Sequence, residues 1–169
     1  MGIITTAPGS RGRNDRNTTD TMRVAATDMT TGVDWGLLAL RFGLGFVFLA
    51  HGAQKVLGMF GGPGLAGTAA FMGQMGIPAP LAYLAAFTEL LGGLAVLLGV
   101  LPRLASLGLM VVMLVAIFQV HLPKGFFAQG GGYEYPFALF FMALAVFLAG
   151  PGRLAFGDWE RAWFWRRNS

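Results

Sequence analysis

Ionisable and amide side chains interrupt two apolar stretches of the sequence. The segment "FLAHGAQKVLG" (residues 48–58) carries His51, Gln54 and Lys55. The second stretch, residues 79–99, contains the single carboxylate of Glu89. An imidazole, an ammonium group and a carboxylate can donate hydrogen bonds to a ligand and transfer protons. Since a charged group at the centre of a bilayer costs roughly 2.5–3.5 kcal/mol on insertion, intramembrane ionisable residues are candidates for a functional site.

Further polar residues complete the candidate ligand site. We include every buried or membrane-embedded polar residue that the topology places near the first two groups: Arg41, His51, Gln54, Lys55, Glu89, Gln119, His121 and Glu134. Structural alternatives stay open for several of them. Lys55 is also placed well for anchoring at the membrane interface, Glu89 for an ion pair with Arg41 or a hydrogen bond to His51, and Glu134 for capping a helix.

Helical geometry places part of this set on one face. At roughly 100° per residue, Arg41, His51 and Lys55 fall on one side of a helix, next to Gly45 and Gly52. Small residues allow a neighbouring helix to approach closely, so this face is predicted to pack toward the interior of a bundle. We therefore expect His51 to point inward, toward the bundle that also contains Glu89.

Composition indicates an integral membrane protein. The 169 residues are 55% hydrophobic and only 12% charged, with a mean hydropathy of +0.62. A bilayer core requires about 20 mostly apolar residues per helix, and four segments approach that length. They are residues 35–57, 79–99, 104–122 and 134–150. The predicted fold is an all-α, integral membrane four-helix bundle, formed by residues 35–152.

Positive charge predicts the orientation of this bundle. Four spans place both termini and the loop near residue 101 on one side, which then carries nine arginines. The opposite side carries Lys55 and Lys124. Because Lys and Arg are enriched in cytoplasmic loops, both termini are expected in the cytoplasm, and the multi-pass protein in the bacterial cytoplasmic (inner) membrane.

The segments outside the four spans receive separate predictions. Residues 1–34 are polar and form a probable flexible tail by composition. Residues 67–78 predict a short helix on the outer surface, with Thr68 as its cap. Residues 153–169 predict a cytoplasmic interfacial segment, in which rings and cations meet lipid headgroups. Its interface residues are Trp159, Arg161, Trp163, Trp165 and Arg166.

Several chemistries are excluded or disfavoured by residue content. The sequence contains no cysteine, which excludes disulfides, thiol redox chemistry and cysteine-ligated metals. No metal-ligand spacing is present, so no metal site is predicted. The net charge of +4 is explained better by anionic lipids than by nucleic acid, because the arginines lie beside apolar segments.

Four stretches resemble the DoxX family of small four-span bacterial membrane proteins. They are "LRFGLGFVFLAHGAQK" (40–55), "GIPAPLAYLAAFTELLGGLAVLLGVLPRLA" (76–105), "GGGYEYPFAL" (130–139) and "GPGRLAF" (150–156). The resemblance implies a four-helix membrane bundle. Some relatives are subunits of a thiosulfate:quinone oxidoreductase, and others are linked to membrane-bound redox or oxidative-stress complexes.

The resemblance and the polar residues together favour one function over three alternatives. The favoured function is an accessory or anchor subunit of a membrane redox complex, with a quinone-type ligand near the outer polar cluster. Such a chain would contribute to a quinone-linked oxidoreductase without being a stand-alone catalyst. The first alternative is a structural or assembly subunit without a ligand, within a larger complex or a homo-oligomer. The others are a b-type cytochrome, with haem bound by His51 and His121, and a small-solute transporter.

Overall fold

A computed structural model describes residues 11–157, with side chains from residue 31 onward, and regular structure in this range is entirely helical. The elements in chain order are α1 (Arg11–Leu57), η1 (Met59–Gly61), α2 (Gly64–Gln74), α3 (Ala79–Leu98), α4 (Pro102–Val115), η2 (Ala116–His121), η3 (Leu122–Lys124), η4 (Ala128–Gly130) and α5 (Glu134–Ala149). η2 is a π-helical turn that continues α4, and the other η elements are 3-10 turns. The interface residues predicted between Trp159 and Arg166 lie outside the described range.

Three helical segments are long and apolar enough to cross a membrane: Thr31–Leu57, Ala79–Leu98 and Pro102–Lys124. The fourth apolar helix, Glu134–Ala149, is shorter. The all-helical membrane fold is therefore confirmed, while the number of spans and their orientation stay predictions. α1 begins at Arg11, inside the polar segment 1–34, and the flexibility of that segment also stays a prediction.

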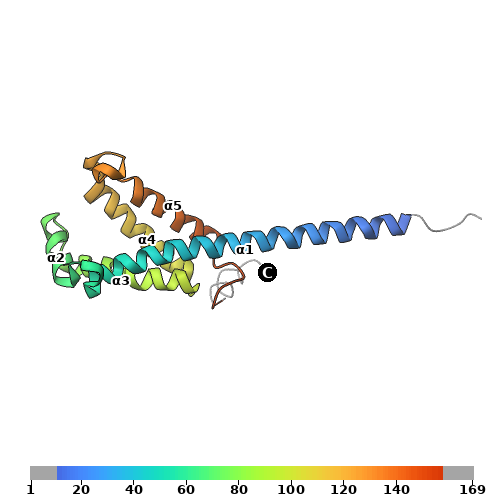
Figure 1. Cartoon of the computed structure of the whole chain (residues 1–169), viewed down its shortest axis with the longest axis horizontal. Coiled ribbons are helices and arrows are strands. Elements are labelled where there is room, and N and C mark those ends of the chain that lie inside the picture. The colour runs from blue at the N-terminus through green and yellow to red at the C-terminus, as the bar shows by residue number, and fades with distance from the viewer. Residues whose placement is uncertain (1–10, 158–169) are drawn as a thin grey trace, which may run out of the picture.

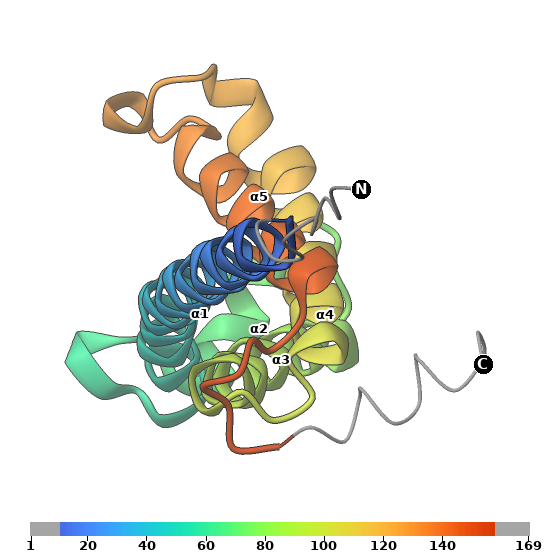
Figure 2. The ribbon, with the colours of Figure 1, turned by 90° about the vertical axis from the view of Figure 1, so that its right-hand side faces the viewer.

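The helices form a bundle that is closed at one end and spread at the other. α1 packs along α3, and the hairpin of α4 and α5 leans away from this pair toward α2 and the loop before α5 (Figure 1). Viewed along α1, the other helices lie around one side of it (Figure 2). We name the end that holds α2 and residues 122–133 the α2 end. The opposite end, which holds residues 99–101 and 150–157, is the closed end.

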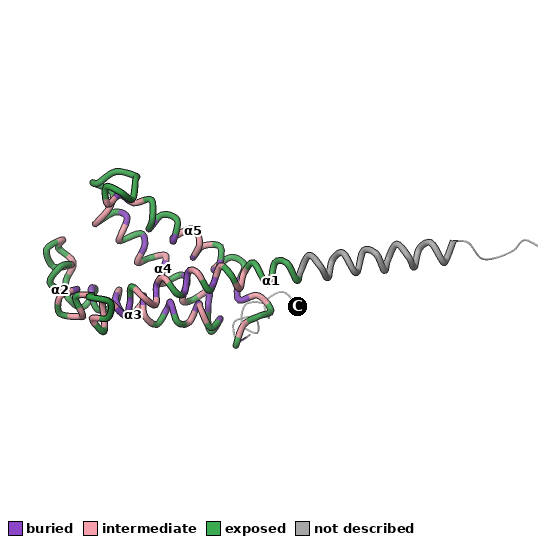
Figure 3. Tube along the Cα trace, in the orientation of Figure 1, coloured by how far each residue is buried: buried purple, intermediate pink, exposed green. Residues whose placement is uncertain are grey.

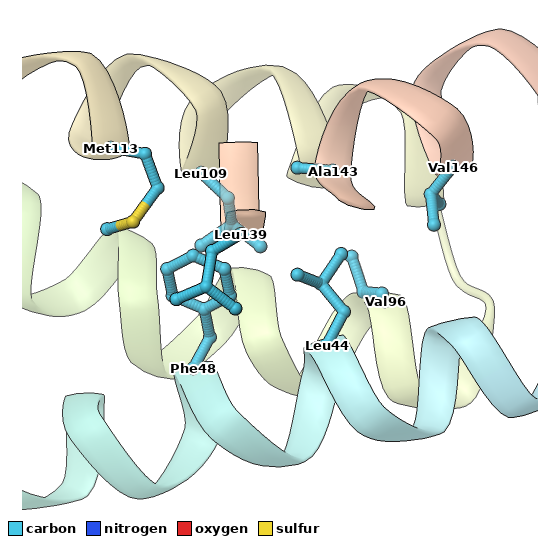
Figure 4. Close-up of a cluster of buried hydrophobic side chains, with 8 residues drawn as sticks. All are labelled: Leu44, Phe48, Val96, Leu109, Met113, Leu139, Ala143 and Val146. Atoms are coloured by element: carbon cyan, nitrogen blue, oxygen red, sulfur yellow. The ribbon is translucent and has the colours of Figure 1, made fainter. Parts of the chain in front are cut away.

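The core fills the space between the four long helices on the side of the closed end. Its buried side chains come from all four helices and interdigitate (Figure 4): Leu44, Phe48, Val96, Leu109, Met113, Leu139, Ala143 and Val146. On α4, Ser106 lies on the same buried stripe as Leu109 and Met113. Its hydroxyl oxygen has no hydrogen-bond partner among the described residues.

Glycines bring α1 and α3 into backbone contact. A Cβ atom added to Gly52 would lie 2.3 Å from Leu90 N, and one added to Gly45 would lie 2.8 Å from Gly93 O. Both distances are too short for any side chain, so the two helices can be this close only where the sequence has glycine. The close approach predicted for this face of the first span is observed.

Replacing Gly52 with alanine is expected to push α1 and α3 apart and to destabilise the protein by about 2–3 kcal/mol, because the atoms in the way belong to rigid backbone. Gly43→Ala is the matched control on the same helix. The Cβ atom of that variant would meet only Met142 Cε, at 4.0 Å. Thermal unfolding in a mild detergent measures the difference, and equal stabilities of the two variants would contradict the close packing.

Candidate functional site

The bundle contains a buried ion pair between α1 and α3. Lys55 Nζ donates a hydrogen bond to Glu89 Oε1 at 2.5 Å. The Glu89 side chain is 2% exposed and the Lys55 side chain is 28% exposed. Lys55 therefore connects the buried carboxylate with the surface of the bundle at the α2 end.

Local packing explains why these two side chains meet. Gly52 lies against the backbone of Leu90, so the next turn of α1 comes within reach of Glu89 on α3. Thr68 on α2 is buried and donates a hydrogen bond to the backbone oxygen of Lys55 at 3.3 Å. The predicted capping role of Thr68 is wrong, because α2 begins earlier, at Gly64, and Thr68 lies inside it. Its hydroxyl instead fixes α2 against the last turn of α1.

One oxygen of Glu89 remains available for a ligand. Glu89 Oε2 is buried and has no hydrogen-bond partner among the residues that the structure describes. Buried polar atoms are almost always hydrogen-bonded, because leaving one unpaired costs roughly 1–3 kcal/mol. The unpaired oxygen, next to an ammonium group, makes the Lys55–Glu89 pair the best candidate site for a polar ligand group.

Arg41 lies at the closed end and does not pair with Glu89. Its guanidinium donates to four backbone carbonyl oxygens, of which two end α3 and two belong to the segment after α5. These are Val96 O at 3.0 Å, Leu97 O at 3.3 Å, Pro151 O at 2.5 Å and Leu154 O at 2.9 Å. Arg41 is 1% exposed, so this role is structural: it joins α1, α3 and the chain after α5.

His51 does not point into the buried core. The residue is exposed, and its ring lies 6.4 Å from the ring of Tyr135 on α5, measured between centroids. The expectation that His51 faces the bundle interior beside Glu89 is therefore wrong. Since α4 and α5 spread away from α1 toward the α2 end, the face of α1 that is covered at Phe48 is uncovered one turn later.

Comparisons with known proteins identify the family. The DoxX family profile matches residues 36–122, which is half of the chain and includes Arg41, Lys55 and Glu89. The chain belongs to the DoxX family. It is 32% identical over 127 residues to "Putative oxidoreductase CatD" of Bacillus subtilis (strain 168), an alignment that covers 75% of this chain and 88% of that protein. No solved structure matches this DoxX protein significantly.

The remaining predicted site residues lie apart from the Lys55–Glu89 pair in this DoxX protein. Gln119 is exposed on the π-helical turn η2. His121 ends this turn, and its Nδ1 donates to Gly131 O at 2.7 Å, since a carbonyl oxygen only accepts. Glu134 begins α5 and accepts a hydrogen bond from Ala128 N at 2.9 Å. His121 and Glu134 therefore shape the loop between α4 and α5.

Gln54 has a similar structural position at the end of α1. It is half-buried, and its backbone lies against Gly62, where a Cβ atom would come within 2.4 Å of Gln54 O. The eight predicted residues thus divide into the Lys55–Glu89 pair, the neighbouring His51, the loop residues and the distant Arg41. Among the described residues there is no group of three or more His, Asp or Glu side chains that could hold a metal ion.

Proposed function

We propose that this DoxX protein is an accessory or anchor subunit of a membrane redox complex and binds a quinone-type ligand at the Lys55–Glu89 pair. The observation that carries the proposal is the buried, unpaired Glu89 Oε2 beside the Lys55 ammonium group. The printed name of the Bacillus subtilis relative, an oxidoreductase, supports the redox class. The family resemblance to subunits of a quinone oxidoreductase supports the ligand.

The pair has the chemistry that a quinone carbonyl requires. A quinone accepts two electrons and two protons to become a quinol, and the electrons would come from a partner subunit that carries a redox cofactor. Lys55 Nζ has further N–H donors besides the one bound to Glu89 and can bind a carbonyl oxygen. Glu89 keeps Lys55 in place and can exchange a proton through Oε2.

Position in the membrane favours the same ligand. Lys55 is partly exposed at the end of a span, so a lipid-soluble molecule can approach it from the bilayer. We propose the cytoplasmic (inner) membrane as the location, with both termini in the cytoplasm, because arginines concentrate on the side of the termini. The pair would then lie in the outer half of the membrane.

Quinone content of the purified protein tests this function. The full chain is purified in a mild detergent, its lipids are extracted, and quinone is quantified per polypeptide by chromatography. We expect near-stoichiometric quinone in the wild type and a loss of most of it in Glu89→Gln and in Lys55→Ala. Gln119→Ala is the control, since Gln119 is exposed and on a different helix, and it should retain the wild-type content.

A structural or assembly subunit without a ligand is the second candidate. It is favoured by Arg41, whose full set of bonds to backbone carbonyls serves the architecture of the closed end alone. In that case the protein would co-purify with other membrane subunits, contain no quinone, and remain unaffected by changes at Glu89. This outcome would overturn the quinone proposal.

A further inference from the structure

A continuous face of α1 leads from the closed end to the Lys55–Glu89 pair. Its residues follow at alternating spacings of three and four, as expected for one side of a helix: Arg41, Leu44, Phe48, His51 and Lys55. Arg41, Leu44 and Phe48 are at most 1% exposed. Burial decreases at the last two residues of this face, where His51 is exposed and Lys55 is 28% exposed.

His51 and Lys55 lie between the two helices that flank this face. Lys55 is bound to α3 through Glu89, and His51 lies next to Tyr135 on α5. The chain is mostly exposed or intermediate toward the α2 end, where α4 and α5 lean away (Figure 3). The two side chains therefore share a part of the α1 surface that the fold leaves uncovered.

The imidazole of His51 lacks a hydrogen-bonding partner. Its only interaction with described residues is the ring contact with Tyr135. A polar group within a span is costly unless it is hydrogen-bonded, because lipid offers no partner. An uncovered imidazole one helical turn from an ion pair with a free oxygen indicates that one ligand contacts both.

We propose that His51 binds the second oxygen of the ligand whose first oxygen binds Lys55, and that this ligand is therefore a para-quinone. Residues at positions i and i+4 of a helix hold their Cβ atoms about 5–6 Å apart. This separation suits two donors that bind the opposite carbonyl oxygens of one six-membered ring. The inference rests on the proposed function, because it assigns the second contact of the same ligand.

Binding of matched ligands to the full chain in lipid nanodiscs tests the inference. The probes are a short-chain 1,4-benzoquinone and a ring monoketone with the same substituents, titrated against tryptophan fluorescence. We expect His51→Ala to weaken the benzoquinone about three- to tenfold, the effect of one lost hydrogen bond, and to leave the monoketone unchanged. His51→Gln keeps a donor and should retain most of the affinity, and Gln119→Ala should bind as the wild type does.

The outcomes separate this inference from the function on which it rests. If the benzoquinone binds and Lys55→Ala weakens it, but His51→Ala does not, the contact with His51 is overturned while the proposed function stands. An equal loss for benzoquinone and monoketone in His51→Ala also overturns it, since His51 then acts on the site as a whole. If the wild type binds neither probe, both proposals fail.

Discussion

Replacing Lys55 with methionine is expected to destabilise the protein by about 3–5 kcal/mol, because the variant leaves the Glu89 carboxylate buried without its cation. The side chain of Glu89 is only 2% exposed, and its bond to Lys55 Nζ is its only hydrogen bond to described residues. A change of this size should lower the midpoint of thermal unfolding by roughly 10 °C for a chain of this length. The measurement is thermal unfolding of the purified chain in a mild detergent.

The double variant Lys55→Met/Glu89→Leu is the control that assigns this loss to the pair. Exchange of a buried ion pair for apolar residues of similar volume is often neutral or stabilising, so we expect most of the wild-type stability to return. A double variant as unstable as Lys55→Met alone would show that the loss comes from packing around residue 55. The charge of Glu89 would then not be its cause.

Replacing Arg41 with methionine is expected to cost about 4 kcal/mol, since hydrogen bonds from a charged group contribute roughly 1.5–3 kcal/mol each and four are lost together. The positive charge also lies at the carboxyl end of α3, where it stabilises the helix dipole. Arg41→Lys should recover only part of the stability, because lysine lacks the planar fork that reaches several carbonyls at once.

Arg153→Met is the matched control for Arg41, since it removes an arginine from the same end of the bundle. The Arg153 side chain is 67% exposed, and its Nε lies 3.9 Å from Asp34 Oδ2. A surface contact of this kind contributes at most about 1 kcal/mol. Unfolding of both variants under the same conditions should therefore separate them clearly, and equal losses would contradict the structural role of Arg41.

Local periodicity was sufficient to predict much of α1. The face that holds Gly45, Gly52 and Lys55 follows from the helical repeat alone, and so does its close contact with a neighbouring helix. The importance of Glu89 also follows from sequence, because a carboxylate within an apolar span needs a partner. These predictions depend on the residue and its own helix.

The positions of His51 and Arg41 depend on tertiary structure and could not be predicted in the same way. His51 lies on the correct face of α1, but its exposure depends on how far α5 diverges from α1 at that level. Arg41 binds backbone oxygens that lie 55 to 113 residues away in sequence. Any residue type supplies a backbone carbonyl, so no side-chain pattern marks these partners.

Quinone content of the double variant Lys55→Met/Glu89→Leu is the most direct test of the ligand site. This variant removes both polar groups of the site, while its expected stability excludes unfolding as the reason for a lost ligand. We expect a folded protein that unfolds close to the wild-type temperature and contains almost no quinone after purification in mild detergent. A folded double variant with the wild-type quinone content would show that the ligand does not bind at the Lys55–Glu89 pair.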